Sequence, residues 1–159
     1  MKNKDIFEIR ESLNNLGEIK GKTFAYTVLQ NKEILDKEIE TIGKLRVEPS
    51  QDFINYENER QLLCIQHSEK NENNEPVLTY NQQNGTQSFK IIDIEKFNED
   101  YKPIHEKYES VLNEKIAEEK EFEEFLNKDS DVVFKKVSIR DLPDDVTESF
   151  LQKIRFMIS

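Results

Sequence analysis

The sequence contains few of the residues on which small secreted proteins and all-β proteins depend. Its one cysteine, Cys64, cannot form a disulfide bond within the chain, so we expect a reducing compartment. Four glycines and four prolines among 159 residues favour helices over an all-β fold. No segment approaches the roughly 20 apolar residues that span a bilayer, and no apolar stretch follows the first lysines as it would in a signal peptide. These absences predict a cytoplasmic protein.

Charged residues are abundant, and most of them are negative. Charged and hydrophobic residues each make up 35% of the chain, and the net charge is −10. Residues 93–128 alone contain 12 acidic and 6 basic side chains. This charge argues against direct binding to nucleic acid or to an anionic membrane, because both require patches of Lys and Arg. We therefore expect protein partners with a basic surface, or a charge that serves solubility alone.

Apolar residues recur at helical spacing over most of the chain and predict five helices. Their expected ranges are about residues 5–16, 23–46, 51–68, 93–127 and 144–158. Gly17 follows the first range as a helix stop, and Ser50 can cap the third helix. Asn31 lies in the apolar stripe of the second helix, where a buried amide could fix the register against a partner helix. Pro103 either kinks the fourth helix or splits it, which would leave 93–100 as a separate short helix.

A small β-hairpin is predicted between the third and fourth helices, at about residues 77–92. Two extended stretches flank Asn84 and Gly85, a pair that fits the positive backbone angles of a tight hairpin turn. Polar residues surround this turn and are expected to face solvent, with contact to a partner as the alternative. They are Gln82, Gln83, Thr86 and Gln87.

These elements predict a mainly α fold in a single domain, residues 1–159. We expect an antiparallel helical bundle or coiled-coil hairpin, with one small β-hairpin between long helices. A short extended segment, residues 132–139, precedes the C-terminal helix. Aromatic residues of the fourth helix favour a core position, although a part of their stripe without internal cover would meet another subunit. These aromatic residues are Phe97, Tyr101, Tyr108, Phe122 and Phe125.

Two pairs of residues have spacings that resemble parts of a catalytic or metal site. Cys64 and His67 lie three residues apart on one helix face, but a reactive cysteine needs an electropositive setting and this surface is acidic. We expect Cys64 to pack as a small apolar group. His105 and Glu109 lie four residues apart and could begin a metal site, whereas an ion pair on the helix surface is the simpler interpretation.

The remaining acidic and glycine patterns predict no chemistry. Paired carboxylates occur in polar runs, where nothing indicates the different environments that separate the pKa values of a catalytic pair. These pairs are Glu118 with Glu119, Glu123 with Glu124, and Asp144 with Asp145. The four glycines are scattered singly, so no phosphate-binding loop is present. We therefore expect a protein without catalytic residues, cofactor or metal, and not an enzyme.

Several short segments occur in the order found in a known group of proteins. The segments are Glu57-x-Glu59-Arg60-Gln61-Leu62, Lys70-Asn71-Glu72-Asn73, Ile92-x-Ile94-x-x-Phe97-Asn98, Ile139-x-x-Leu142-Pro143 and Phe156-x-Ile158. In this order the chain resembles a family of small, largely uncharacterised helical proteins encoded in bacteriophage genomes, often near virion genes. The resemblance implies a viral protein in the host cytoplasm or in the virion, and it supplies no catalytic residues.

Three functions are compatible with these patterns. The first is a phage structural or assembly protein that self-associates, as a homo-oligomer or part of a larger assembly, through an uncovered apolar stripe. The second is an acidic binding module that inhibits a host protein. The third is a small chaperone, because helical arms tipped by a β-hairpin resemble prefoldin subunits. All three act through protein–protein contacts, without direct binding to nucleic acid or membrane.

Overall fold

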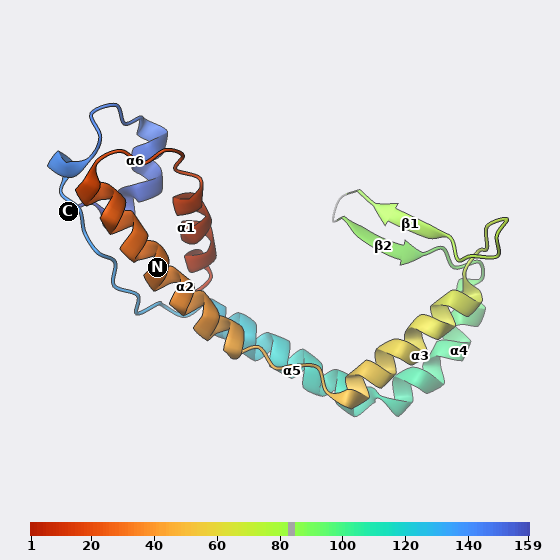
Figure 1. Ribbon diagram of the computed structural model, residues 1–159. Helices are drawn as coiled ribbons and strands as arrows, with labels where there is room; N and C mark the ends of the chain where they lie inside the picture. The colour runs from red at the N-terminus through yellow and green to blue at the C-terminus, as the bar shows by residue number, and fades with distance from the viewer. Residues whose placement is uncertain (83–84) are drawn as a thin grey trace. The chain divides into compact units, whose positions relative to one another are not determined.

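The computed structural model describes residues 1–82 and 85–159 and confirms a mainly α fold with one small β-hairpin (Figure 1). The α-helices are α1 (Asp5–Asn14), α2 (Lys22–Lys44), α3 (Gln51–His67), α4 (Ile94–Lys107), α5 (Glu109–Leu126) and α6 (Glu148–Ile154). Strands β1 (Leu78–Asn81) and β2 (Thr86–Phe89) pair antiparallel, and η1 (Ile139–Asp141) and η2 (Arg155–Met157) are short 3-10 helices. Within the described ranges, no helix combines the length and the apolar composition needed to cross a membrane.

The chain divides into two compact units. Unit 1 comprises Met1–Val47 and Glu119–Ser159, and unit 2 comprises Glu48–Glu118. One of the two divisions falls within α5, between Glu118 and Glu119. A division by contacts does not test whether either unit folds alone, so the single domain expected for residues 1–159 stays a prediction.

Unit 1 is built on the apolar face of α2. Phe24, Val28, Leu35 and Ile42 lie along one side of this helix and are at most 1% exposed. Helix α1 and the C-terminal segment cover that side, because their own apolar residues are spaced to meet it. These covering residues are Ile6, Leu13, Ile154 and Met157, all fully buried. Tyr26, Leu29 and Leu45 lie outside this buried face and are at least half exposed.

Asn31 is the polar residue in this buried face, and it binds a non-helical segment. Its side chain is fully buried, donates a hydrogen bond to the Lys135 carbonyl (3.0 Å) and accepts one from the Lys135 N–H (2.8 Å). The predicted burial of the Asn31 amide is confirmed. The prediction that it contacts a partner helix is wrong, because it binds the backbone of Lys135 instead. A carboxamide carries a donor and an acceptor, so it can pair with one peptide unit whose backbone groups no helix uses.

The segment that Asn31 binds is extended but forms no strand in the described chain. Residues 131–136 have no regular secondary structure, and Val137 makes an isolated parallel bridge with Ile158. In that bridge the Val137 N–H donates to the Met157 carbonyl (2.8 Å), and the Ser159 N–H donates to the Val137 carbonyl (3.0 Å). The extended segment expected at 132–139 is therefore held by side-chain and single-bridge contacts rather than by a sheet.

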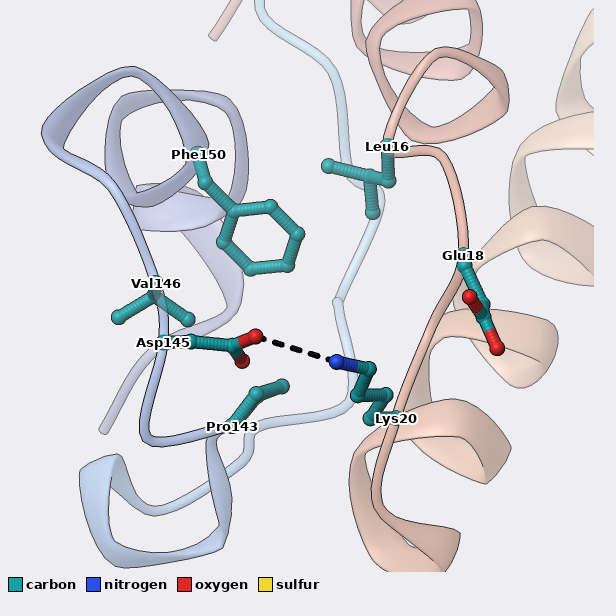
Figure 2. Close-up of a pocket in the computed structure, with 7 residues that line it drawn as sticks. All are labelled: Leu16, Glu18, Lys20, Pro143, Asp145, Val146 and Phe150. Atoms are coloured by element: carbon teal, nitrogen blue, oxygen red, sulfur yellow. Dashed lines mark hydrogen bonds and ion pairs between the residues drawn. The ribbon is translucent and has the colours of Figure 1, made fainter.

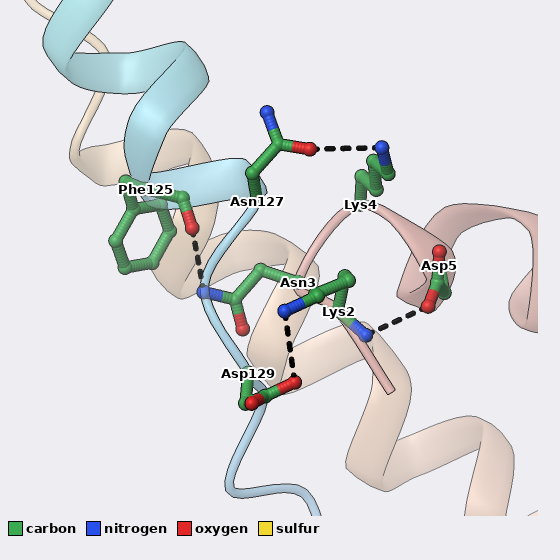
Figure 3. A network of polar contacts seen from close by, with 7 residues as sticks. All are labelled: Lys2, Asn3, Lys4, Asp5, Phe125, Asn127 and Asp129. Carbon is green, nitrogen blue, oxygen red and sulfur yellow. Dashed lines mark hydrogen bonds and ion pairs between the residues drawn. The ribbon is translucent and has the colours of Figure 1, made fainter.

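The N-terminal residues cap the last turn of α5 (Figure 3). The side-chain amide of Asn3, which is 5% exposed, donates a hydrogen bond to the Phe125 carbonyl (3.0 Å). The Asn3 and Lys4 N–H groups donate to the carbonyls of Lys128 and Leu126, each at 3.0 Å. The final carbonyls of a helix have no partner within it, so this segment satisfies groups that would otherwise need water.

Unit 2 contains the helices α3 and α4, which lie side by side in Figure 1. Ser50 begins α3 as predicted, because its hydroxyl accepts a hydrogen bond from the Phe53 N–H (3.2 Å). Asp93 begins α4 in the same way and accepts from the Lys96 N–H (3.0 Å). A short polar side chain at the N-cap stabilises a helix start, so these two boundaries follow from the sequence.

The long helix expected at 93–127 is broken, but not at Pro103. Pro103 lies inside α4, and the break falls at Tyr108, whose φ of −110° and ψ of 13° are not helical. The Tyr108 N–H is shared between the carbonyls of Ile104 and His105 at 3.2 Å each, an arrangement common at helix ends. A proline removes only one hydrogen bond from the helix, and here the helix continues past it.

The C-terminal helix expected at 144–158 is also shorter than predicted. Asp144 and Asp145 form a turn, and α6 begins only after Thr147, whose hydroxyl accepts a hydrogen bond from the Phe150 N–H (3.2 Å). Both aspartate and threonine favour helix starts, and the threonine makes the cap in this structure. Helix α6 then passes directly into η2.

Replacing Asn31 by alanine is expected to destabilise the protein by about 2–3 kcal/mol, because two hydrogen bonds are lost and the Lys135 backbone groups are left without the amide. Urea unfolding followed by circular dichroism measures the change. Gln30→Ala, a neighbouring amide on α2 that is half-buried, serves as the control and should change stability by less than about 0.5 kcal/mol. A similar small loss for Asn31→Ala would contradict the assigned role.

Candidate interaction surface

The base of the β-hairpin is tied to the end of α3 by backbone hydrogen bonds. The Glu69 N–H donates to the Lys90 carbonyl (2.8 Å), and the Val77 N–H donates to the Glu69 carbonyl (2.8 Å). The Lys90 N–H donates to the Val77 carbonyl (2.9 Å), so three backbone hydrogen bonds join these three residues to one another. In addition, the Ile92 N–H donates to the His67 carbonyl (3.0 Å). These bonds fix where the hairpin leaves the helix.

The predicted hairpin is present, with strands that cover residues 78–81 and 86–89 of the expected 77–92. Gly85 has a φ of +68°, the positive angle that the Asn84-Gly85 turn requires, and its N–H donates to the Asn81 carbonyl (2.9 Å). Asn84 itself lies outside the described residues, as does Gln83 of the polar tip. The other tip residues, Gln82, Thr86 and Gln87, are exposed as expected.

The hairpin has one apolar face and one polar face. Its register pairs Leu78 with Phe89, Thr79 with Ser88, Tyr80 with Gln87 and Asn81 with Thr86. Paired residues point to the same side of a sheet and alternate along each strand. Leu78, Tyr80 and Phe89 therefore share a face with Gln87. On the opposite face, the hydroxyls of Thr79 and Ser88 form a hydrogen bond (2.9 Å).

The apolar face is open. Leu78 is 49% exposed and Tyr80 is 62% exposed, while Phe89 is half-buried. Antiparallel sheets with alternating patterns normally bury the apolar face against a core. A two-stranded hairpin without such cover is only marginally stable in water. This face is therefore a surface on which a partner would add both burial and order.

The hairpin is also an uncharged segment within an acidic unit. Unit 2 contains 15 acidic and 7 basic residues, a net charge of −8 within a chain total of −10. From Pro76 to Phe89 the sequence contains no charged residue. The polar tip of the hairpin was predicted from the sequence, whereas its apolar face was not. The charge-free run, together with the alternation of Leu78, Tyr80 and their neighbours, was the signal that could have revealed it.

The aromatic residues for which the sequence favours a core position are buried only in part: Tyr108 is buried, whereas Phe97, Tyr101, Phe122 and Phe125 are half-buried. In unit 2, the Phe97 and Tyr101 rings stack at 5.9 Å. The hydroxyls of Tyr56 and Tyr101 lie 2.7 Å apart and join α3 to α4. Burial and this hydrogen bond raise the pKa of Tyr56 above its ordinary value. In unit 1, Phe122 and Phe125 pack against the core.

Glu59 makes the principal charged contact between α3 and the end of α4. Its Oε1 accepts hydrogen bonds from the Lys107 ammonium group (2.6 Å) and from the Tyr108 hydroxyl (2.8 Å). The Lys107 hydrogen bond, followed by that of Tyr108, lowers the pKa of the Glu59 carboxyl below its ordinary value of 4.5. Both donors stabilise the ionised carboxylate, so the contact is strongest when Glu59 is charged.

Cys64 and His67 share a helix but face different partners. Cys64 is 8% exposed and packs within the small core of unit 2, as expected for a structural cysteine. The His67 ring meets the Phe97 ring edge-on at 5.8 Å. Its Nε2 is buried and lies 3.0 Å from Asp100 Oδ2 without making a hydrogen bond.

The prediction of a surface ion pair between His105 and Glu109 is wrong. Within the described residues no ion pair joins them, because the helix break at Tyr108 lies between them. The His105 ring instead packs edge-on against Tyr101 at 5.9 Å. Across residues 1–82 and 85–159, no group of three or more His, Cys, Asp or Glu side chains is placed to hold a metal ion.

The paired carboxylates lie at the surface, with single partners. Glu118 forms an ion pair with Lys115 (3.3 Å), and Asp145 forms one with Lys20 (3.1 Å). The hydrogen bond from Lys20 is the main reason that the pKa of Asp145 is lowered. Glu119, Glu123 and Glu124 are exposed, as is Asp144. The solvated acidic face expected from the sequence is therefore present.

A small cavity of about 210 Å³ lies in unit 1 (Figure 2). It is lined by Leu16, Glu18, Lys20, Pro143, Asp145, Val146 and Phe150. The Lys20–Asp145 ion pair lies among these lining residues and connects the loop before α2 to the loop before α6. Ligand pockets in proteins usually measure roughly 300–1,000 Å³, so this cavity is small for an organic cofactor. The hairpin is the better candidate for a functional surface.

A comparison of the chain with known protein families, curated proteins and solved structures gives no match.

Removing either donor to Glu59 is expected to raise its pKa toward 4.5. A lowered pKa means that the folded state gains stability from this contact above the ordinary pKa and loses it as the pH falls through the lowered value. An NMR titration of the Glu59 carboxyl carbon in Tyr108→Phe and in Lys107→Gln measures the effect. Lys102→Gln, which removes a lysine of α4 that pairs with Glu106 and not with Glu59, is the control and should leave the Glu59 titration unchanged. An unchanged Glu59 titration in Tyr108→Phe and Lys107→Gln would contradict the contact.

Proposed function

We propose that this protein is not an enzyme and that it acts through protein–protein contacts, as a structural or assembly protein. The observation that carries the proposal is the β-hairpin of unit 2, whose apolar face is open while its base is fixed to α3. A fixed base presents Leu78 and Tyr80 in a defined orientation, which lowers the entropic cost of binding. Binding of a protein partner would cover the face.

The thin core of unit 2 supports the same proposal. The buried residues in its described part are Tyr56, Leu63, Cys64, Ser68 and Tyr108. Seven large apolar side chains of this unit are at least 42% exposed: Ile54, Leu62, Leu78, Tyr80, Ile92, Ile94 and Ile116. Small units with little buried apolar surface usually gain stability from a partner. Unit 1, by contrast, surrounds α2 with a continuous apolar core.

A bacteriophage setting and a homo-oligomeric state belong to this proposal as predictions. The phage setting comes from the resemblance in sequence order alone. Self-association is favoured because the exposed apolar side chains of unit 2 recur on every copy of the chain. Assembly of like subunits would then bury them at each contact.

The acidic charge of unit 2 favours a second candidate, an inhibitor that binds a basic host protein. A net charge of −8 in this unit would attract a basic surface and accelerate encounter. Such binding weakens as salt screens the charges. The first candidate predicts the opposite dependence, because two acidic copies repel each other less at high salt. A prefoldin-like chaperone is a further form of the contact proposal and requires that client aggregation be suppressed.

We expect sedimentation velocity of the full chain to show association between about 1 and 200 µM, the range in which weak protein contacts form. The reason is the exposed apolar surface of unit 2. The sedimentation coefficient should increase with concentration and increase further on addition of salt. A strict monomer throughout this range would contradict self-assembly. Salt-weakened binding to a basic protein would then support the second candidate.

A further inference from the structure

We propose that the apolar face of the β-hairpin binds a second copy of this chain, with the two hairpins packed face to face about a two-fold axis. The inference rests on the proposed function and names the partner. It also names the residues that meet, which are Leu78, Tyr80 and Phe89 of both copies.

Charge selects a second copy as the occupant. The helices of unit 2 are acidic: α3 contains Asp52, Glu57 and Glu59 against Arg60 alone, and residues 93–118 carry 8 acidic and 4 basic side chains. Two copies that met through these helices would bring like charges together. The hairpin from Pro76 to Phe89 carries no charge, so two copies can meet there without that repulsion.

An uncharged face also makes a poor site for a basic partner. A protein attracted by the net charge of −8 would dock where the carboxylates are, on α3, α4 and α5, and would gain nothing electrostatic from the hairpin. The hairpin instead offers aliphatic and aromatic side chains, which bind another apolar surface. A second copy presents such a surface with the same dimensions, and in an isologous contact the same patch of both copies meets.

The geometry of the hairpin favours packing of faces over pairing of edges. Side chains stand roughly perpendicular to a sheet, so the addition of a strand at an edge would leave Leu78 and Tyr80 in solvent. Face-to-face packing places two sheets about 10 Å apart and covers both side chains. The polar face, with its Thr79–Ser88 hydrogen bond, then remains toward water.

Tyr80 is suited to the centre of such a contact. Its ring belongs to the apolar face and is 62% exposed. Its hydroxyl lies toward the turn, because a Cβ built at Gly85 would be 3.6 Å from it. A tyrosine in this position can bury its ring and keep its hydroxyl at the wet rim, an arrangement for which tyrosine is enriched at interfaces.

The test compares Tyr80→Lys with Thr79→Lys in the full chain. The two changes introduce the same charge at neighbouring positions of β1, but on opposite faces of the hairpin. We expect Tyr80→Lys to weaken dimerisation at least tenfold, because it places a charge at the centre of an apolar contact. Thr79→Lys should leave the dimerisation constant within about twofold of the original. Sedimentation equilibrium measures both constants. Unchanged circular dichroism shows that the helices remain folded.

Each outcome of this comparison supports the inference or overturns it. Equal weakening by the two variants would indicate pairing at the strand edges and would overturn the face-to-face contact. If neither variant weakens an association seen in the original chain, the hairpin is not the contact, although the proposed function stands. If the original chain is a strict monomer, the inference and self-assembly both fail.

Leu78→Lys provides a second variant on the apolar face and should weaken dimerisation in the same direction as Tyr80→Lys. Salt provides an independent readout. Raising the ionic strength from about 0.05 to 0.5 M shortens the screening length to a few ångströms, so a dimer of acidic chains should strengthen. A dimer that weakens with salt would contradict an uncharged contact.

Discussion

The buried amide of Asn31 is the interaction on which the architecture of unit 1 depends. Helix α2 offers the longest apolar face of the unit, and the non-helical segment 131–136 must lie against it. A backbone without a helix or strand brings unpaired N–H and C=O groups to that face. Asn31 pairs both groups of Lys135, at 2.8 and 3.0 Å, where a leucine would pair neither. Because this segment leads to α6 and η2, the amide positions the chain that supplies Ile154 and Met157 to the core.

Unit 2 differs from unit 1 because few of its apolar side chains are buried. Polar and aromatic contacts join its helices: the Tyr56–Tyr101 hydroxyl pair, and Glu59 with Lys107 and Tyr108. Contacts of this kind are directional and orient helices, but they contribute less free energy than a large core does. The apolar side chains that remain exposed are the physical basis for proposing that a partner completes the unit.

Charge is distributed unevenly within unit 2, and this distribution supports the proposed contact at the hairpin. Like charges on the acidic residues of α3, α4 and α5 would oppose a contact between the helices of two copies. The charge-free hairpin from Pro76 to Phe89 is the place where that repulsion is weakest. In the proposed dimer, this distribution of charge would favour contact at the hairpin over contact between helices. The same charges oppose unspecific aggregation through the exposed side chains of the helices.

Local chemistry made most elements of this fold predictable from the sequence. Ser50 caps α3, Gly85 adopts a positive φ, and the spacing of Phe24, Val28, Leu35 and Ile42 buries one side of α2. These features depend on neighbours within a few residues, and such neighbours are legible in a sequence. The break at Tyr108 and the late start of α6 were not predictable in this way. At each boundary two positions compete. The long helix could break at Pro103 or at Tyr108, and α6 could begin after Asp144 or after Thr147.

The sequence by itself determined the helical class, the hairpin and its turn, the acidic charge and the burial of Asn31. Which residues those features contact depends on the tertiary structure alone. It paired Asn31 with the backbone of Lys135, placed Tyr108 and Lys107 on Glu59, and left Leu78 and Tyr80 exposed. Alternation along a strand specifies that a face is apolar, but whether a core covers that face depends on segments far away in the chain. In unit 2 this face stays exposed at Leu78 and Tyr80, and a second copy of the chain is the cover that we propose for it.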